Sequence, residues 1–414
     1  MSSSPAAAPV APAAPANLNF VLVAVFIDML GIGLIIPVMP ALVGQYVNGR
    51  DEQAFWFGVL AMVFGLMQFI FMPMLGAISD RVGRRPVLLY SMAGMCLNFL
   101  ATAWAPNLAF LFVGRVIGGM SSASMSVASA YASDISTPET RAKSFGKVGA
   151  AFGLGFICGP ALGGMLGEIN LQLPFYVAAA LCAANFVYGY IAVPESLPLS
   201  RRSAFSIAKI NPFSSLLKLV RRTDIRAVVI VFALTSFAQM MLQSTWVLYT
   251  TFRFNWSPGD NGIALFCVGL SAAVVQAGLL GMLMKRFGEV RLSLLGMVSG
   301  CITFVLYGLA TQGWMMYVFI LCNLLSFTVG PALQSIISRG SDASAQGELM
   351  GSLQSISSLG VIFMPLLGTA ILGLASHLPP HDWRIGSTFF LCAAMQAVAV
   401  GVALFYFKSH QMRT

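Results

Sequence analysis

Residues 76–85 read GAISDRVGRR, and this stretch decides how the chain around it is interpreted. It places four charged residues within ten, between apolar runs at about 55–79 and 86–104. A charged turn this short between apolar runs of about 20 residues is typical of two membrane-spanning helices joined by a tight loop. Gly76 allows close helix packing, and Gly83 allows a sharp turn.

The composition of the whole chain agrees with a membrane protein. Of its 414 residues, 58% are hydrophobic and only 9% are charged. A soluble domain carries about 25% charged residues, and disorder requires low hydrophobicity with high charge. A soluble enzyme and a disordered chain are therefore both excluded. The net charge of +9 does not indicate nucleic-acid binding, because the basic residues lie between apolar runs instead of clustering on one face.

Twelve apolar runs are long enough to span a bilayer, and we interpret each as a transmembrane helix. They cover residues 19–44, 55–79, 86–104, 108–133, 144–167, 174–193, 225–252, 258–284, 290–311, 314–338, 347–375 and 384–407. When the loops are assigned alternately to two sides, 19 of the 23 Lys and Arg residues fall on one side. Loops rich in Lys and Arg stay in the cytoplasm. The pattern predicts a multi-pass membrane protein with both termini in the cytoplasm.

The segments outside the spans divide the chain into two halves. Residues 1–18 are uncharged and rich in Ser, Ala and Pro, which predicts a disordered tail, and residues 408–414 form a short C-terminal tail. Residues 194–224 are polar and basic, which predicts a cytoplasmic linker with a surface helix near 205–219. The alternative is a simple tether. The linker separates two six-helix bundles, at residues 19–193 and 225–407.

An internal repeat supports this division. The charged turn recurs after the eighth span, where residues 281–291 read GMLMKRFGEVR. The sequence PALG at 160–163 is matched by PLLG at 365–368. Both matches lie 205 residues apart, which indicates a duplicated six-helix unit. Paired repeats with a binding site at their interface are a transporter architecture.

The charged turn is also a candidate cytoplasmic gate. Asp80 is predicted to face the N-terminus of a helix in the other half, where the helix dipole favours an anion. Arg84 is predicted to reach Asp134 at the inner end of the fourth span. The alternative is positive-inside anchoring, which accounts for the arginines but not for Asp80. Because Lys285 replaces Asp80 in the second copy, the gate should be asymmetric. The candidate gate residues are Gly76, Asp80, Arg81, Gly83, Arg84, Arg85 and Asp134.

The fifth span carries a stripe of small residues around a proline. Small residues permit tight helix packing in lipid, and Pro160 is expected to bend the helix. Packing alone is the alternative explanation for the glycines. The residues of this motif are Gly155, Gly159, Pro160, Gly163 and Gly164.

One acid and one base lie well inside predicted spans, Asp28 in the first and Arg115 in the fourth. Intramembrane charges are costly and by default mark a functional site. We therefore interpret Asp28 as a functional residue, with Arg115 orienting it or setting its proton affinity. The alternatives are a structural ion pair between the two, or an Arg115 that extends toward the membrane surface.

Uncharged polar residues within spans are candidates for the wall of a substrate cavity, or they join helices by hydrogen bonds. They are Gln68, Asn98, Gln239, Gln243, Gln276, Asn323 and Gln334. The seven cysteines lie in apolar runs without metal-ligand spacing, and the three histidines lie near the outer surface or the tail. We find no sequence pattern for a metal site, an organic cofactor or an enzyme.

These motifs together resemble the major facilitator superfamily. Residues 76–85 match its loop signature, and Gly159-Pro160-x-x-Gly163-Gly164 resembles the signature of its drug/proton antiporters. The first span from Asp28 to Pro40 is similar to the tetracycline/proton antiporter branch. So are AYASD at 130–134, WSP at 256–258 and PALQ at 331–334. The resemblance implies an all-α membrane fold of twelve helices, in two pseudo-symmetric bundles around a central cavity that opens to one side at a time.

Two positions depart from the tetracycline pumps of Gram-negative bacteria. Those pumps carry an acid in the third span, where this chain has Asn98, and another in the ninth span, where it has Gly300 or a neighbour. Asn98 can neither release a proton nor pair electrostatically with a cationic drug. This argues against tetracycline as the substrate and leaves Asp28 as the main candidate for coupling.

The residues and the resemblance together predict a secondary transporter of the bacterial inner membrane that exports amphipathic small molecules in exchange for protons. The proton is then the coupling ion, membrane lipid is the surrounding solvent, and one chain holding both halves is expected to act as a monomer. The first alternative is uptake of a metabolite by symport or uniport. The second is a membrane receptor or assembly protein that transports nothing.

Overall fold

The computed structural model describes residues 18–202, 226–339 and 346–411. All regular structure within these ranges is helical, as the sequence predicts. The first half contains α1 (Leu18–Ile35), α2 (Met39–Gly44), α3 (Arg50–Val82), α4 (Arg84–Ala103), α5 (Leu108–Ser121), α6 (Ser124–Asp134), α7 (Pro138–Ile169) and α8 (Leu173–Ala192). The second half contains α10 (Arg226–Phe254), α11 (Pro258–Ala273), a π-helical segment (Val274–Leu279), α12 (Leu280–Leu309), α13 (Gly313–Cys322), α14 (Val329–Arg339), α15 (Gln346–Ala375) and α16 (Ser387–Gln411). Short 3₁₀ turns lie at Leu199–Arg201, Leu324–Thr328 and Trp383–Gly386.

The helices are long and apolar enough to cross a membrane. Among the described residues ten such helices are found, or eleven when the bent pair Gly313–Cys322 and Leu324–Ser338 counts as one span. One of them, Pro258–Leu309, has 52 residues and contains Gly288 at a φ of 72°. At 1.5 Å per residue it is about 78 Å long, more than twice the roughly 30 Å hydrocarbon core. It therefore holds two spans, and the described chain accommodates the twelve that the sequence predicts.

Three of the predicted spans are interrupted, where the sequence analysis expected continuous helices. The first span breaks between α1 and α2 at Pro37, which has no backbone N–H to donate to the helix. The fourth breaks between α5 and α6 at Ser122, and the tenth bends by 48° between α13 and α14. The fifth span is one continuous helix, α7, which runs through Pro160.

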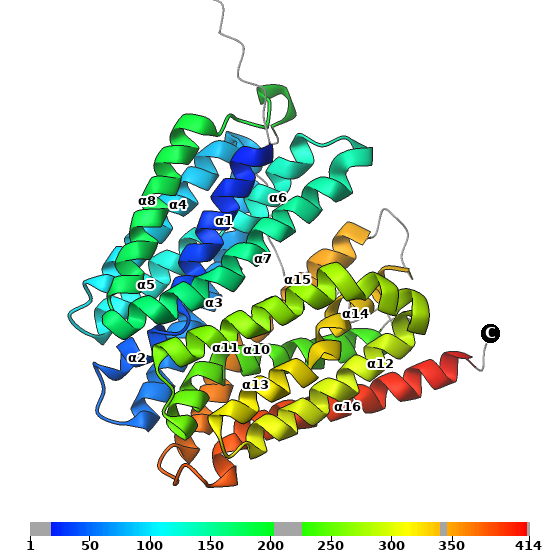
Figure 1. The fold of residues 1–414 in the computed structure, drawn as a ribbon. Helices are drawn as coiled ribbons and strands as arrows, with labels where there is room; N and C mark the ends of the chain where they lie inside the picture. The colour runs from blue at the N-terminus through cyan, green and yellow to red at the C-terminus, as the bar shows by residue number, and fades with distance from the viewer. Residues whose placement is uncertain (1–17, 203–225, 340–345, 412–414) are drawn as a thin grey trace, which may run out of the picture.

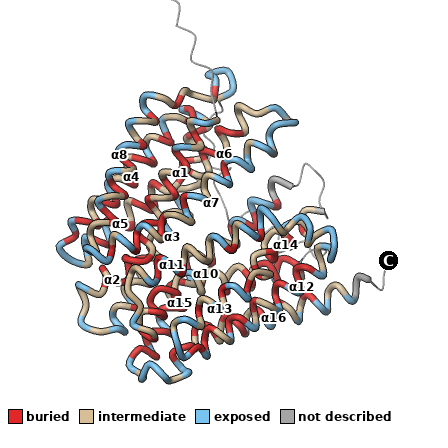
Figure 2. Tube along the Cα trace, viewed as in Figure 1, coloured by how far each residue is buried: buried red, intermediate tan, exposed pale blue. Residues whose placement is uncertain are grey.

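Each half forms its own helical bundle. In the first, α1 packs on α7 and α8, and α4 packs on α5 and α8. In the second, α10 packs on α15 and α16, and α12 packs on α14 and α16. Figure 2 shows the buried residues running along the inside of both bundles. The fold class expected from the sequence, an all-α membrane protein, is confirmed.

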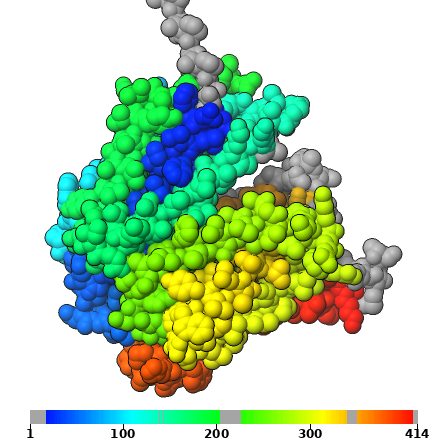
Figure 3. Space-filling model, in the orientation of Figure 1, coloured from blue at the N-terminus to red at the C-terminus, as the bar shows by residue number. Residues whose placement is uncertain are grey.

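The two bundles touch at one end and diverge at the other (Figure 1). We call the end where α1 begins and α16 ends the terminal side, and the other end the opposite side. The bundles meet through two helix pairs, α3 with α15 and α7 with α11. Figure 3 shows the surfaces of α7 and α11 in contact along this seam. Ala54 of α3 is fully buried within the same apolar cluster as Met241 and Leu372, so the closed end is a continuous core.

Some of the predicted boundaries and segments fall differently or are not described. The proposed surface helix near 205–219 lies outside the described residues, as does nearly all of the N-terminal tail. Leu18, assigned to that tail, is the first residue of α1. The C-terminal tail was expected from residue 408, but α16 continues to Gln411.

Candidate functional site

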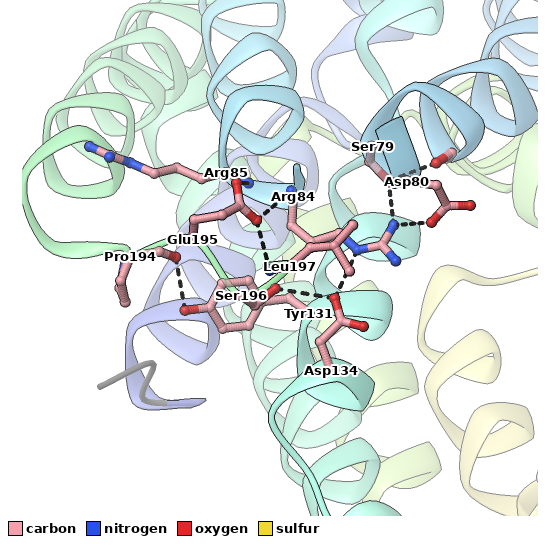
Figure 4. A network of polar contacts seen from close by, with 11 residues as sticks. Ser79, Asp80, Arg84, Arg85, Tyr131, Asp134, Pro194, Glu195, Ser196 and Leu197 are labelled. Carbon is pink, nitrogen blue, oxygen red and sulfur yellow. Dashed lines mark hydrogen bonds and ion pairs between the residues drawn. The ribbon is translucent and has the colours of Figure 1, made fainter. Parts of the chain in front are cut away.

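The predicted contact between Arg84 and Asp134 is present on the terminal side (Figure 4). The guanidinium Nε of Arg84 lies 2.9 Å from Oδ2 of Asp134, joining the start of α4 to the end of α6. Nη1 of Arg84 lies 2.6 Å from Oδ1 of Asp80 and donates to the Ser79 hydroxyl, also at 2.6 Å. Ser196 donates to the same Asp134 oxygen at 3.2 Å. A single arginine therefore ties together α3, α4, α6 and the chain that follows α8.

The other predicted contact of this gate is not formed. Asp80 was expected to face a helix N-terminus in the second half, but in the described chain its carboxylate pairs with Arg84 of its own bundle. Its side chain remains 45% exposed. The reason is geometric, because the two bundles diverge on this side (Figure 1). Arg81 is also exposed here, and Arg85 donates to the carbonyl of Tyr190.

Glu195 is the central residue of this network that the sequence analysis did not assign (Figure 4). Its carboxylate accepts hydrogen bonds from the backbone N–H groups of Arg84 at 2.8 Å, Arg85 at 3.2 Å and Leu197 at 3.0 Å. Helix α4 begins with two arginines and has Gly83 at its N-cap, so its own sequence supplies no capping side chain. Glu195, which follows the last helix of the bundle, caps α4 instead. A carboxylate is stabilised at a helix N-terminus.

The two copies of the charged turn share one backbone feature. Gly83 and Gly288 are the glycines with positive φ among the described residues, at 111° and 72°, and they stand 205 positions apart. Other residues rarely adopt these angles, so both turns require glycine. The second turn also reaches the tenth span, since Ser335 donates to Glu289 at 2.8 Å. The repeat inferred from sequence is therefore visible in backbone conformation.

The small residues of the fifth span lie on two different contacts. A Cβ on Gly155 would lie 2.6 Å from the carbonyl oxygen of Phe26, and a Cβ on Gly159 would lie 2.6 Å from Cα of Gly33. A Cβ on Gly163 would lie closer still to the carbonyl oxygen of Leu34. These three glycines bring α7 against α1 within the first bundle, beside Pro160.

Gly164 instead faces the second bundle. A Cβ at this position would lie 2.5 Å from the carbonyl oxygen of Pro258 at the start of α11. One turn further, Glu168 accepts a hydrogen bond of 2.8 Å from the N–H of Gly259, in the first turn of α11. Arg50 of α3 donates to the carbonyl of Phe252 at 3.3 Å. The opposite side is thus closed by backbone contact and by polar bonds between bundles, none of which was predicted from the sequence.

Asp28 lies in the middle of α1 and is 2% exposed. The Ser124 hydroxyl of α6 and the Cys182 thiol of α8 lie beside it. Its Oδ1 atom is enclosed and makes no hydrogen bond with the described residues. A buried carboxyl oxygen without a partner is costly, so its environment is not that of an ordinary structural carboxylate.

Arg115 does not pair with Asp28, contrary to one interpretation of the sequence. The guanidinium lies over the ring of Phe64, 5.7 Å from its centroid. Its Nε and Nη2 atoms are enclosed and have no hydrogen-bond partner among the described residues. The physical reason is placement, because Arg115 on α5 faces α3 while Asp28 on α1 faces α6 and α8. Arg115 therefore does not orient Asp28 in this conformation.

The uncharged polar candidates do not form one cluster. Gln68 donates to the Ser122 hydroxyl at 3.0 Å, close to Phe64 and Arg115. Asn98 is fully buried against Gly118 of α5, so it packs between helices instead of standing in an open wall. Asn323 is buried at the break of the tenth span and Gln239 is half-buried. The exposed members are Gln243, Gln276 and Gln334.

Comparisons with known proteins agree with this architecture. The family model described as Major Facilitator Superfamily matches residues 21–365 and again 228–413. The chain is 39% identical to the tetracycline resistance protein, class C, of Escherichia coli, over 90% of this chain and 94% of that protein. It is 33% identical to the class B protein of Escherichia coli (90% and 93%) and 29% identical to multidrug resistance protein 2 of Bacillus subtilis (86% and 89%).

Solved structures share the fold at lower sequence identity. The human organic anion transporter MFSD10 superposes with a TM-score of 0.69 at 23% identity, covering 93% of this chain and 98% of that one. The nucleoside transporter NupG gives 0.75 at 12% identity, covering 94% and 99%. The chain therefore belongs to the major facilitator superfamily, in the tetracycline-resistance branch of its drug/proton antiporters.

Proposed function

We propose that this protein exports amphipathic small molecules from a bacterial cell in exchange for protons. The observation that carries the proposal is the uneven seam between the bundles, closed on the opposite side and divergent on the terminal side. A transporter that alternates access needs two such ends, of which one is closed at a time. The relatives named for tetracycline and multidrug resistance support export as the direction.

The terminal side faces the cytoplasm in this proposal. The excess of Lys and Arg in the loops on this side supports the orientation, since such loops are retained inside. Both termini are then cytoplasmic, in the inner membrane, and the structure is the inward-facing state. A monomer suffices because one chain holds both bundles.

Asp28 carries the coupling proton. Asp28 is buried at mid-span, and one of its carboxyl oxygens has no hydrogen-bond partner among the described residues. The free energy of this site therefore depends on whether the side chain is charged or protonated. It takes up a proton when the cavity faces outward and releases it when the cavity faces inward. The driving force acts through the difference in proton affinity between the two states, because a ligand shifts an equilibrium only by that difference.

The Arg84 network keeps the first bundle rigid while the terminal side opens and closes. Asp80, exposed in the inward-facing state, meets a helix of the second bundle in the outward-facing state. The bond between Glu168 and Gly259 on the opposite side breaks in that transition, so each state has a carboxylate contact at its own closed end.

The experiment uses purified protein in liposomes that contain a pH-sensitive dye. A proton gradient is imposed, and tetracyclines, other amphipathic drugs and amphipathic metabolites are added in turn. Wild type is expected to move protons in response to a transported compound, and Asp28→Asn is expected to lose this response. The control is Asp382→Asn, which removes a carboxylate that pairs with Arg384 in a loop on the opposite side.

Four results would change the proposal. Equal proton movement by Asp28→Asn would make Asp28 structural. Transport of a compound down its own gradient without protons would indicate a uniporter, and movement of compound and protons in the same direction would indicate symport. No response to any compound would favour a receptor or assembly protein.

A further inference from the structure

The break in the fourth span places a helix N-terminus inside the first bundle. Helix α5 ends at Ser121, and a new helix, α6, begins at Ser124. The first backbone N–H groups of an α-helix have no partner within that helix. Ala123 stands at the N-cap of α6 and has no side-chain oxygen that could accept from them. The start of α6 therefore presents hydrogen-bond donors and the positive end of a helix dipole, which both favour an anion.

The carboxyl group of Asp28 lies at this N-terminus. Helices α1 and α6 pack together, and Met29 shares a buried apolar cluster with Ala123 and Val127. The Ser124 hydroxyl lies beside the carboxyl. Asp28 is 2% exposed and Ser124 is 7% exposed. Neither Oδ1 of Asp28 nor the Ser124 hydroxyl has a hydrogen-bond partner elsewhere in the described chain, so a bond between the two residues satisfies both.

The other groups around Asp28 are less suited to this role. Helix α8 contributes the Cys182 thiol, which is a weak donor. Helix α7 meets α1 through glycines, and its charged residues lie toward its two ends. The titratable groups of α6, Tyr131 and Asp134, bond within the network of Figure 4. Arg115 of α5 faces α3 in this conformation. The hydroxyl at the start of α6 is therefore the stronger of the two side-chain donors beside Asp28.

The second bundle repeats the break without the polar pair. Helix α14 begins at Val329, 205 positions after Ser124, so a helix restarts at the same place in both halves. The residue 205 positions after Asp28 is Ala233, on α10, which packs on α14. Val329 belongs to an apolar cluster against which Ala233 packs. A broken span therefore folds with two apolar residues at these positions, and the fold itself does not require the acid and the hydroxyl of the first bundle.

We propose that Ser124, at the uncapped N-terminus of α6, is a positioning residue that stabilises the carboxylate form of Asp28 and so sets the pH at which this acid releases its proton. A hydroxyl accepts from a carboxylic acid and donates to a carboxylate, so it serves both protonation states. The bond to the charged form is the stronger one, and the helix dipole acts in the same direction. This inference rests on the proposed function for the use of the proton in transport.

Two variants of equal shape isolate the hydroxyl. Ser124→Thr keeps it, and Ser124→Val replaces it by a methyl group, giving the residue that the second bundle has at this position. Purified full-length protein in lipid nanodiscs is titrated in an infrared cell. The C=O stretch of the protonated Asp28 carboxyl is identified by its absence from Asp28→Asn. The pH at which half of this band is lost should be unchanged in Ser124→Thr and about one unit higher in Ser124→Val, because a hydrogen bond to a charged group is removed.

The matched control is Ser129→Val. Ser129 lies on the same helix, but its hydroxyl donates to the carbonyl of Met125 at 2.8 Å. This variant should keep the wild-type midpoint. The inference is overturned by equal midpoints in Ser124→Thr and Ser124→Val, by an equal shift in Ser129→Val, or by a wild-type spectrum without a titrating band that depends on Asp28.

Failure of the proposed function is recognised separately in the liposome assay. Proton exchange that persists in Asp28→Asn would overturn the use of this acid in transport. A midpoint that still differs between Ser124→Thr and Ser124→Val would then leave the role of Ser124 standing. Exchange that depends on Asp28, with equal midpoints in the two variants, would overturn the present inference alone.

Discussion

Both ends of the seam between the bundles carry glycines, but only on the opposite side do these glycines contact the other bundle. On the opposite side, Gly164 lies against Pro258, and Gly58 of α3 would place a Cβ 3.2 Å from Cα of Leu366 in α15. On the terminal side, a Cβ added to several glycines of the same four helices or their continuation would meet nothing within 4 Å. These are Gly76, Gly146, Gly149, Gly153, Gly281 and Gly351.

The repeat explains where the unfilled glycines belong. Gly281 and Gly351 stand 205 positions after Gly76 and Gly146. The closed end joins α3 to α15 and α7 to α11, and the unfilled glycines lie on α3, α7, α15 and the start of α12. We infer that these glycines form the contact surface of the outward-facing state, in which the terminal side closes as the opposite side closes now.

The largest effect is expected from filling the closed end. Gly164→Val would force its side chain into the backbone of α11, and overpacking of this kind costs about 1–3 kcal/mol or more. The thermal midpoint of the purified protein should fall, and proton-coupled transport should be abolished because the opposite side can no longer close. An unchanged midpoint with normal transport would show that α7 and α11 are not tightly joined here.

Filling the open end should separate stability from transport. A Cβ at position 281 meets nothing within 4 Å in the inward-facing state, so the thermal midpoint of Gly281→Val should match wild type, but transport should fall about tenfold or more because closure of the terminal side is overpacked. The control is Gly401→Val on α16, where an added Cβ also meets nothing within 4 Å and which lies away from the seam. If both variants transport equally well, Gly281 is not part of a closing surface.

The sequence predicts features that depend on composition and on the spacing of residues along the chain. It does not predict contacts between residues that are distant in the sequence. The spans, the repeat and the contact between Arg84 and Asp134 follow from apolar runs and from the charged turn. Glu195 was recognised only as part of a polar linker, because nothing in its local sequence reveals that it caps α4, which lies about 110 residues earlier. The missing cap of a helix that begins with two arginines was the one available signal.

The placement of Arg115 could not be predicted for a related reason. A helical pattern shows that Asp28 and Arg115 lie within spans, and an ion pair is the simplest arrangement of two intramembrane charges. Which face of α5 meets α3 depends on Gly119, whose contact with Phe64 is a property of the packed bundle. The distance between two charges on separate spans therefore depends on how each helix is rotated about its own axis, and composition does not determine that rotation.

An intermediate effect is expected from the cap on α4. Glu195→Ala removes an acceptor from three backbone N–H groups, and loss of a helix cap costs about 0.5–2 kcal/mol. Because Glu195 acts within the first bundle and not at the seam, stability should fall equally in both conformations. The thermal midpoint measures the loss of stability. The reactivity of single cysteines on either side of the membrane measures the balance between the two states, and it should not change. A shift in that balance would show that Glu195 takes part in the seam.

The smallest effects test whether the two ends oppose each other. Glu168→Gln keeps an acceptor for the N–H of Gly259 but removes a charge at a helix N-terminus, an interaction of about 0.3–1 kcal/mol. The population should shift about two- to fivefold toward the outward-facing state. Distances between spin labels at positions 170 and 311, on the two bundles at the opposite side, report the shift in a background without the native cysteines.

Asp80→Asn should produce the reverse shift. Asp80 makes no contact with the described residues of the second bundle in the inward-facing state. Its ion pair with Arg84 lies within the first bundle and is weakened in both states, so the shift reports the contact made only when the terminal side is closed. The same pair of labels should therefore report a smaller population with a wide separation. Glu168→Gln weakens the closed opposite side, and Asp80→Asn weakens the closed terminal side. If closing one side opens the other, the two variants must shift the population in opposite directions. Shifts of the same sign would mean that the two ends open independently, and the comparison between filled and unfilled glycines would then describe local packing instead of alternating access.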